Sequence, residues 1–377
     1  MTSMPSTTLI QLALMGLVVA ALPLSLIWLA RGADKFGRLC QVAMFMTFDL
    51  IVFGAYTRLT DSGLGCPDWP GCYGQANPLQ AHTDIHAAQI AMPTGPVTLT
   101  KAWIEMIHRY LAMSVGVLII SIVVLAWIFW LKSKRRNRQY APWLPMWLLA
   151  AVCLQGAFGA LTVTMKLQPV IVTGHLLLGM TLLALLAWQS ARQRGAGVLP
   201  PSAAALRAPG LAAAVVLTLQ IALGGWVSTN YAALACTDFP LCHGVWWPAM
   251  DFANGFTLWR KLGMTAAGAY LPFGALTAIH VTHRSFAFVV AGLLGWLAWR
   301  AYRIDGMQRL AAALALILTL QMSTGLATVA LEWPLALAVL HNAGAALLVV
   351  LVAMLNYKVR SVAAVTAVAV PRALPAF

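Results

Sequence analysis

A cysteine-bounded stretch, "GLGCPDWPGCYG" at residues 63–74, returns later in the chain as "ALACTDFPLCHG" at residues 233–244. When Cys66 is placed on Cys236, the second cysteine, the aspartate and the proline of the two stretches also coincide. Self-similarity at a fixed distance is the signature of a structural unit that occurs more than once. We therefore expect two copies of one unit, each carrying this loop.

Further correspondences follow the loop in the same order in both halves. They are "EMIHRYLA" (105–112) with "HVTHRSFA" (280–287), "QGAFGALTV" (155–163) with "QMSTGLATV" (321–329), and "VTGHLLLG" (172–179) with "VLHNAGAA" (339–346) at their histidines. In both halves the glutamine precedes the second histidine by 20 residues. The order and the spacing favour duplication of a whole unit.

The composition is that of a membrane protein. Of the 377 residues, 61% are hydrophobic and 9% are charged, whereas soluble domains average about 25% charged residues. A hydropathic segment of about 20 residues predicts a membrane-spanning helix. Nine such segments occur, at about 8–30, 39–57, 103–131, 142–164, 169–190, 209–229, 274–299, 307–330 and 334–356.

The predicted fold is an all-α polytopic membrane protein with two tandem four-helix-bundle repeats and an extra N-terminal transmembrane helix. Because four spans are an even number, the two bundles have the same orientation and are related by a parallel pseudo-twofold axis. We divide the chain into the extra helix (1–38), the N-terminal four-helix unit (39–192), a linker rich in Gly, Pro and Ala (193–208), the C-terminal four-helix unit (209–357) and a cytoplasmic tail (358–377).

The formal net charge of +14 comes from basic residues that gather in alternate connections between the predicted spans. The positive-inside rule places such connections in the cytoplasm. We therefore expect a multi-pass protein of the bacterial-type inner (cytoplasmic) membrane, with the N-terminus outside and the C-terminus in the cytoplasm. The basic connections would face anionic membrane lipid, and no nucleic-acid binding is expected. The first segment lacks a basic n-region and exceeds the apolar run of a signal peptide, which favours an uncleaved span.

Four of the eight histidines occupy equivalent positions of the two units, near the outward ends of their helices: His108, His175, His283 and His341. A lone histidine in a bundle is most often a hydrogen-bonded interior group, but polar groups at membrane depth are costly and tend to be functional. Two imidazoles from facing helices can hold a haem iron by both axial positions. Zinc or copper would need three or four ligands close together. Each unit is therefore expected to bind one porphyrin.

An arginine directly follows the first of these histidines in each unit. A guanidinium donates bidentate hydrogen bonds to carboxylates, so Arg109 and Arg284 are candidates to hold haem propionates. The alternative is that both side chains extend to lipid headgroups. The sequence leaves the two interpretations open.

Glu105 lies three residues before His108, on the same helix face. The only other glutamate of the chain is Glu332. A carboxylate in a spanning helix is costly without a role, so Glu105 is predicted to act as a general base or to stabilise charge on the substrate. Its alternative role is to orient a ligand. The matching position before His283 holds His280, which is an alternative iron ligand one turn away.

The motifs "GAYTRLTDSGLGCPDWPGCYG", "WIEMIHRY" and "QGAFGALTV" and the paired "HR" helices resemble those of the haem A synthase family over about residues 40–356. The resemblance implies oxidation of haem O to haem A, in which the C8 methyl becomes a formyl group by successive hydroxylations and loss of water. It implies Glu105 as the catalytic residue, His108 and His175 as ligands of haem O in the first unit, and His283 and His341 as ligands of a haem b cofactor in the second.

The same resemblance implies haem O synthase and haem-copper oxidase assembly factors as partners. An unidentified electron donor or acceptor is also needed, and self-association into a homo-oligomer is left open. Family members commonly have eight spans, so the helix within residues 1–38 is an addition. The alternative function is a di-haem b-type membrane electron carrier that exchanges electrons with quinone. Glu105 favours the enzyme, because a carrier does not need an acid in one unit only.

Each loop places two cysteines on the predicted oxidising face, Cys66 with Cys72 and Cys236 with Cys242. A disulfide in each would close a seven-residue loop and stabilise the protein by roughly 2–2.5 kcal/mol. The alternative is a redox couple near the haem edge. Cys40 and Cys153 have no equivalents in the repeat and are expected to be buried thiols.

Overall fold

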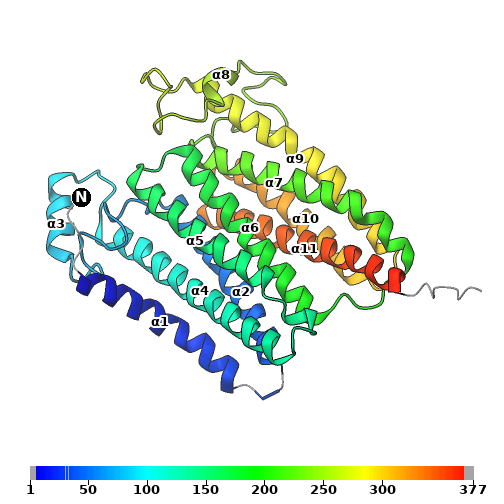
Figure 1. Ribbon diagram of the computed structural model, residues 1–377. Helices are drawn as coiled ribbons and strands as arrows, with labels where there is room; N and C mark the ends of the chain where they lie inside the picture. Colours follow the sequence, from blue (N-terminus) through cyan, green and yellow to red (C-terminus); the bar gives the residue numbers. More distant parts are fainter. Residues whose placement is uncertain (1–5, 30, 33, 369–377) are drawn as a thin grey trace, which may run out of the picture.

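The computed structural model describes residues 6–29, 31–32 and 34–368, with side chains to residue 362. Within these ranges the chain is helical, with nine helices long and apolar enough to span a membrane (Figure 1). They are α1 (Ser6–Leu29), α2 (Lys35–Leu59), α4 (Leu99–Lys132), α5 (Trp143–Thr164), α6 (Pro169–Arg194), α7 (Arg207–Thr229), α9 (Phe273–Tyr302), α10 (Gln308–Ala330) and α11 (Leu335–Val368). The predicted all-α polytopic fold is confirmed.

Four short helices complete the described part of the chain. They are α3 (His82–Ala91) and α8 (Phe252–Gly255) in the two long loops, and the 3-10 helices η1 (Arg138–Tyr140) and η2 (Pro201–Leu206) in connections at the other end of the bundle. Of the predicted tail, residues 358–368 continue α11, because no proline or glycine interrupts them. Residues 369–377 of the tail and residues 1–5 of the N-terminal segment lie outside the described part.

Helices form here because a chain in lipid must satisfy its backbone hydrogen bonds internally. Side chains fix where they begin. The Asp34 carboxylate accepts a hydrogen bond from the Gly37 amide at 2.7 Å, at the start of α2. The Thr98 hydroxyl accepts from the Lys101 amide at 3.2 Å, at the start of α4. Both are N-caps of the usual kind, and they fix where the two helices that carry the first loop between them begin.

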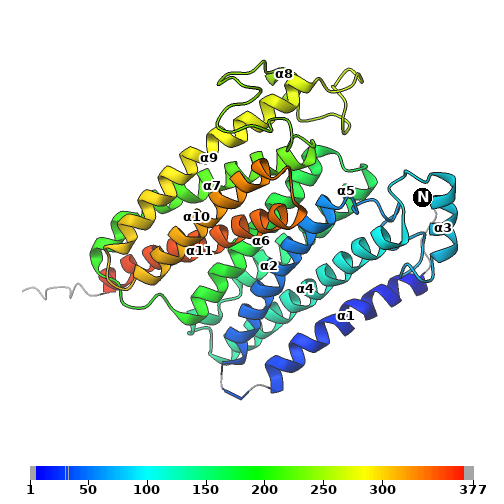
Figure 2. The ribbon, with the colours of Figure 1, turned by 180° about the vertical axis from the view of Figure 1, so that it is seen from behind.

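The spans form two rings of four helices (Figures 1 and 2). In the first ring, α2 and α5 each pack against both α4 and α6. In the second ring, α7 and α10 each pack against both α9 and α11. The helices that carry the paired histidines, α4 with α6 and α9 with α11, are therefore at opposite corners of their rings. The helix α1 lies outside the first ring, against α4 and α2.

The contacts between the two rings are those expected if a twofold axis relates α2 to α7 and α6 to α11. The helices α6 and α11 meet at the centre, α2 also packs on α11, and α7 packs on α6. This arrangement is consistent with the tandem repeat.

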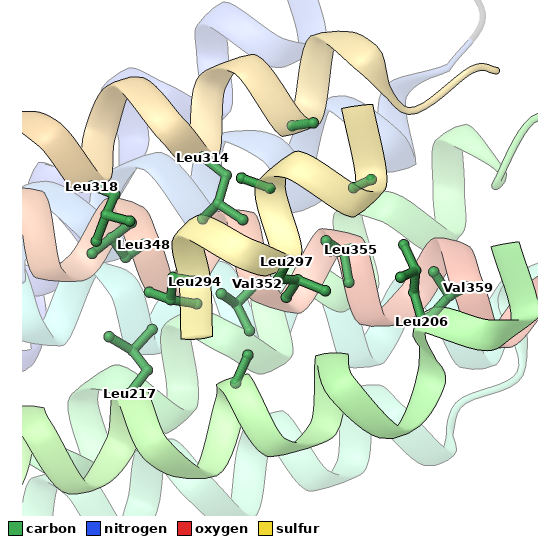
Figure 3. Packing of buried hydrophobic residues seen from close by; sticks show 14 of the residues in the cluster. Leu206, Leu217, Leu294, Leu297, Leu314, Leu318, Leu348, Val352, Leu355 and Val359 are labelled. Carbon is green, nitrogen blue, oxygen red and sulfur yellow. The ribbon is translucent and has the colours of Figure 1, made fainter. Parts of the chain in front are cut away.

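The second ring is held by a large apolar cluster, in which Leu217 of α7, Leu294 of α9, Leu314 of α10 and Val352 of α11 are buried (Figure 3). Burying a side chain of this size contributes about 1.5–3 kcal/mol. The cluster fills the part of the ring away from the cysteine loop and leaves the histidines nearer the other end.

Polar contacts tie the two rings together where α2 and α7 end. The Arg58 guanidinium donates to the Ser228 carbonyl at 2.7 Å and lies 3.0 Å from the Asp61 carboxylate. The Tyr231 hydroxyl donates to the same carboxylate at 2.6 Å. The two cysteine loops start from these helix ends, so the contacts fix the loops relative to each other.

Candidate functional site

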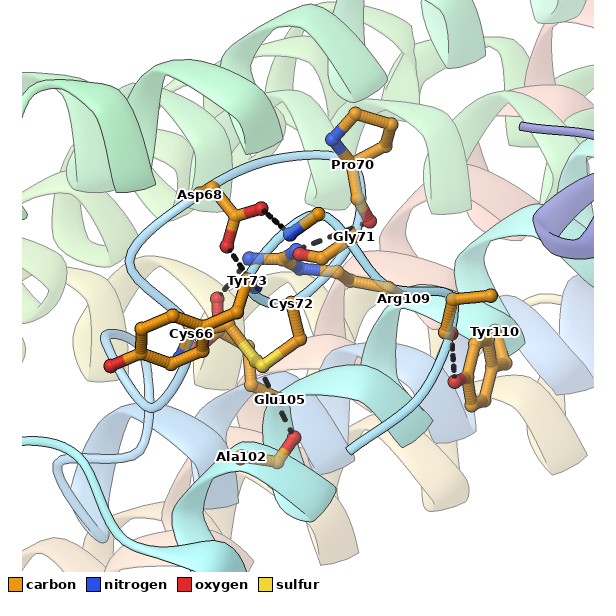
Figure 4. Close-up of a disulfide and its surroundings, with 12 residues drawn as sticks. Cys66, Asp68, Pro70, Gly71, Cys72, Tyr73, Ala102, Glu105, Arg109 and Tyr110 are labelled. Carbon is orange, nitrogen blue, oxygen red and sulfur yellow. Dashed lines mark hydrogen bonds and ion pairs between the residues drawn. A yellow bond between two sulfur atoms is a disulfide. The ribbon is translucent and has the colours of Figure 1, made fainter. Parts of the chain in front are cut away.

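The first cysteine loop is a closed structure that sits on α4 (Figure 4). A disulfide joins Cys66 to Cys72, and both cysteines are fully buried. The Asp68 carboxylate accepts hydrogen bonds from the backbone amides of Tyr73 at 2.6 Å and Gly74 at 2.7 Å. The loop is therefore fixed at both ends of its turn.

Glu105 lies between this loop and α4, and its side chain is buried. One carboxylate oxygen accepts a hydrogen bond from the Cys66 amide at 2.8 Å. The other oxygen forms an ion pair with the Arg109 guanidinium, one helical turn further on. The same guanidinium donates to the carbonyl oxygens of Pro70 and Gly71 (Figure 4). Loop, carboxylate and guanidinium thus form one polar cluster beside His108.

The second loop repeats this construction with one substitution. A disulfide joins Cys236 to Cys242. The Cys236 amide donates to Nδ1 of His280 at 3.3 Å, so His280 takes the place that Glu105 has in the first unit. The Arg284 guanidinium donates to the Asp238 carbonyl at 2.8 Å, as Arg109 does to its own loop.

These contacts bear on the predictions for His280 and the two arginines. His280 faces its cysteine loop, whereas the neighbouring His283 faces α7, so the two side chains have different surroundings. Arg109 is buried among loop carbonyls and Glu105 rather than extended to headgroups. The Arg284 Nη1 atom is buried and has no hydrogen-bond partner within the described residues. A propionate contact by either arginine stays a prediction.

Backbone amides also stabilise the ionised carboxylate of Asp238 in the second loop. The amides of Gly244 and His243 hydrogen-bond to the Asp238 carboxylate at 2.8 and 2.9 Å. They stabilise the ionised form and hold the pKa of Asp238 below its ordinary value. In the first loop, the backbone amides at the equivalent positions, Tyr73 and Gly74, donate to Asp68 in the same way. Each loop is therefore organised around a carboxylate that accepts two backbone hydrogen bonds.

In the first unit, the two predicted histidine ligands lie on helices at opposite corners of the ring. His108 of α4 packs against Gly54 of α2, and His175 of α6 packs against Gly159 of α5. A Cβ atom added to these glycines would lie 2.9 and 3.3 Å from the imidazole Cε1 atoms. Only glycine leaves this room for the rings.

The second unit has the same arrangement. His283 of α9 packs against Gly224 of α7, and His341 of α11 packs against Gly325 of α10. The corresponding distances from an added Cβ to Cε1 are 3.0 and 2.9 Å. The four glycines are equivalent in pairs in the repeat, so each ring holds two imidazoles by the same packing.

This donor set fits a haem better than a bare metal ion. Two opposed imidazoles supply the two axial ligands of a six-coordinate haem iron. In the first unit the Nδ1 atoms of His108 and His175 are buried without hydrogen-bond partners, and Nε2 of His175 lies 3.5 Å from the Gln155 amide. Among the described residues, no group of three or more His, Cys, Asp or Glu side chains could hold a metal ion by itself.

Sequence analysis missed two side chains next to the second pair. The Gln220 amide lies 3.2 Å from Nδ1 of His283, and the Thr324 hydroxyl lies 3.2 Å from Nδ1 of His341. The repeat contained the signal for both, because the aligned positions of the first unit hold Leu50 and Phe158. The alignment places polar residues, Gln220 and Thr324, where the first unit has apolar ones, and this difference could have singled them out.

The structure tests the two expected disulfides and the two expected buried thiols. Both loop disulfides are present. Cys40 is buried as expected, but Cys153 is exposed on α5, so the prediction of a buried thiol there was wrong. The apolar pattern of α5 did not reveal which of its faces points away from the ring.

The protein spans the membrane with two four-helix rings, and each ring has paired imidazoles beneath a disulfide-closed loop. It is therefore a candidate membrane haem protein. The chain belongs to the COX15-CtaA family: the model of this family, described as cytochrome oxidase assembly protein, matches residues 37–353. The matched range covers both rings and omits α1.

Individual relatives agree with the family match. The chain is 39% identical over 322 residues to a protein of Shewanella oneidensis named "Heme A synthase", covering 85% of this chain and 95% of the relative. It is 28% identical over 340 residues to a protein of the same name from Caulobacter vibrioides, covering 84% and 93%. A third relative of this name, from Nitrosospira multiformis, is 28% identical over 345 residues, covering 85% and 92%.

Proposed function

We propose that this protein is a haem A synthase, an oxidoreductase that converts haem O to haem A. The family match and the relatives of that name support the activity. The observation that carries the proposal for this chain is the difference between its two otherwise equivalent loops. A buried carboxylate, Glu105, contacts the loop in the first unit, and an imidazole, His280, has that position in the second. One unit is thus equipped for chemistry that the other is not.

The first unit is assigned to the substrate. Its ligands for haem O would be His108 and His175, which pack against Gly54 and Gly159 of the same ring. Glu105 is the catalytic residue, because it is an acid on the same helix as the ligand His108, three residues before it. Its charge is compensated by the Arg109 guanidinium and the Cys66 amide. Such preorganised partners make a buried carboxylate available for proton transfer or for stabilising charge that develops on the substrate.

The second unit is assigned to a resident haem b. His283 and His341 would hold it, and their imidazoles pack against Gly224 and Gly325. When bound, haem b supplies one-electron redox chemistry to the oxidation of haem O. His280 stays on its loop in this assignment, so that the ligand of α9 is His283.

The disulfides are assigned a structural role. The Cys66–Cys72 bond and the two hydrogen bonds to Asp68 hold the backbone amide of Cys66 against Glu105. A loop closed in this way fixes the position of the catalytic carboxylate relative to the ring. The alternative, a redox role for the cysteines, predicts a much larger loss of turnover when they are replaced.

The setting follows from the nine spans. The protein is a multi-pass membrane protein, and we place both cysteine loops on the outer side of the cytoplasmic membrane and the basic connections in the cytoplasm. Haem O synthase would supply the substrate, haem-copper oxidase assembly would use the product, and a separate donor or acceptor would exchange electrons with the enzyme.

The test is to purify the protein, supply haem O, and identify the bound porphyrins by mass. The proposal expects haem A and a hydroxylated intermediate from the wild type, and neither from Glu105→Gln. The competing function, a di-haem electron carrier, expects haem b only and no change of added haem O. Glu332→Gln is the matched control, because Glu332 is the other glutamate of the chain and its side chain is exposed on the turn between α10 and α11.

A further inference from the structure

The two histidine pairs differ in what their Nδ1 atoms contact. In the second unit, Nδ1 of His283 lies 3.2 Å from the Gln220 amide, and Nδ1 of His341 lies 3.2 Å from the Thr324 hydroxyl. In the first unit, the Nδ1 atoms of His108 and His175 are buried and have no partner within the described residues. Both Nδ1 atoms of one ring have a partner, and neither Nδ1 atom of the other ring has one. The Nε2 atoms of His175 and His341 do not differ in this way, since each faces a glutamine amide, Gln155 at 3.5 Å and Gln321 at 3.2 Å.

Two substitutions within the repeat account for the difference. The register that places Gly54 on Gly224 also places Leu50 on Gln220. The register that places the glutamines of α5 and α10 on each other also places Phe158 on Thr324. The glycines that receive the imidazoles are the same in both rings. Polarity at these two positions therefore changes while the packing of the histidines does not.

The contacts suit imidazoles that bind iron through Nε2. Such a ring carries its hydrogen on Nδ1 and needs an acceptor there. The Thr324 hydroxyl donates to the Gln321 carbonyl at 3.1 Å, so its oxygen is free to accept from His341. The Gln220 amide nitrogen lies 3.2 Å from both Nδ1 and the backbone carbonyl of His283, and the amide oxygen is buried without a partner. When Nδ1 carries the hydrogen, a half-turn of the amide gives up the bond to the carbonyl and offers its oxygen to Nδ1. Each ligand of the second ring thus has an acceptor within reach.

We propose that Gln220 and Thr324 are positioning residues that make the second unit a site of permanent haem binding, and that Leu50 and Phe158 leave the first unit free to exchange its porphyrin. The inference rests on the proposed function, in which the first unit must release a product and the second keeps a cofactor. Partners of this kind fix the tautomer and orientation of a ligating histidine and raise its basicity. Their absence makes a ligand easier to displace.

The experiment uses the purified holoprotein in detergent, with excess apomyoglobin as the acceptor of released haem b. Gln220→Leu and Thr324→Val should each accelerate haem b transfer by about 10-fold or more, the usual effect of removing such a partner. Both should raise the midpoint potential of haem b in a spectroelectrochemical titration, because a less basic imidazole stabilises ferric iron less. Thr324→Ser retains the hydroxyl and should restore both values.

The control is Thr319→Val, on the same helix, because the Thr319 hydroxyl bonds only to the Ala315 carbonyl and faces outward. The reciprocal variant Leu50→Gln should slow porphyrin release from the first unit by a similar factor. Haem b retention and potential equal to wild type in both Gln220→Leu and Thr324→Val would overturn the inference, as would a Thr324→Ser variant as impaired as Thr324→Val.

These outcomes are separate from a failure of the proposed function. A wild-type protein that converts haem O and keeps haem b, with variants indistinguishable from it, leaves the function standing and removes the inference. A wild-type protein that binds no haem b in the second unit removes both. Loss of all haem b from a variant that remains monodisperse, while Thr319→Val keeps it, is the extreme form of the expected result.

Discussion

Replacing Glu105 tests how the carboxylate proposed to be catalytic is held as well as what it does. In the wild type, Glu105 accepts from the Cys66 amide and pairs with Arg109, and both side chains of the pair are buried. Removing one partner of a buried ion pair costs about 3–5 kcal/mol, because the other charge stays buried. We therefore expect Glu105→Ala to lower the free energy of unfolding by about that amount and to abolish haem A formation, with haem b still bound.

Two further variants separate stability from chemistry. Glu105→Gln keeps one oxygen that can accept from the Cys66 amide, but its amide group leaves Arg109 without a counter-charge. Its loss of stability should therefore be at least that of one charged hydrogen bond, about 1.5–3 kcal/mol. Its haem A formation should nevertheless be absent. Glu105→Ala combined with Arg109→Met removes both charges and should recover part of the stability lost by the single change.

The assay is SDS titration of the protein in mixed micelles, paired with mass analysis of porphyrins after incubation with haem O. Glu332→Ala is the reference, since an exposed side chain should change stability by less than about 0.5 kcal/mol. If Glu105→Ala were as stable as Glu332→Ala, the buried ion pair would not be the structural support described here. If it made haem A at the wild-type rate, its catalytic role would be wrong.

Three other predictions concern the second unit and the first loop. His283→Ala should remove the haem b absorption spectrum, and its retention would reverse the assignment of the two units. Gly224→Ala places a methyl group 3.0 Å from the His283 ring and should weaken haem b binding at least tenfold in a haem titration, whereas Gly292→Ala, which meets nothing within 4 Å, should not. Cys66→Ser with Cys72→Ser should cost roughly 2–2.5 kcal/mol and slow turnover modestly; complete inactivity of a folded protein would indicate redox chemistry instead.

Much of the fold was accessible from the sequence because a membrane imposes strong patterns. Apolar runs identified the nine spans, and the repeat paired the histidines correctly with equivalent helices. The repeat also marked the difference between Glu105 and His280. That difference acquired its meaning only when both side chains were found on the amide of the first cysteine of their loops.

The rest depended on which side chains of neighbouring helices face one another. Spacing along one helix cannot show that Gln220 of α7 meets His283 of α9, since the two residues are 63 positions apart. For the same reason, Arg109 was expected at a propionate or a headgroup rather than on the carbonyls of Pro70 and Gly71. The contacts between rings and loops are set by tertiary packing, and a single sequence carries little information about them.

The most direct test of the account is the identity of the porphyrins that leave the purified wild-type protein after incubation with haem O and a source of reducing equivalents. Mass analysis should find haem A and its hydroxylated precursor together with haem b. Recovery of unchanged haem O beside haem b, from protein shown to be folded, would contradict the central claim that one of two equivalent rings transforms its porphyrin.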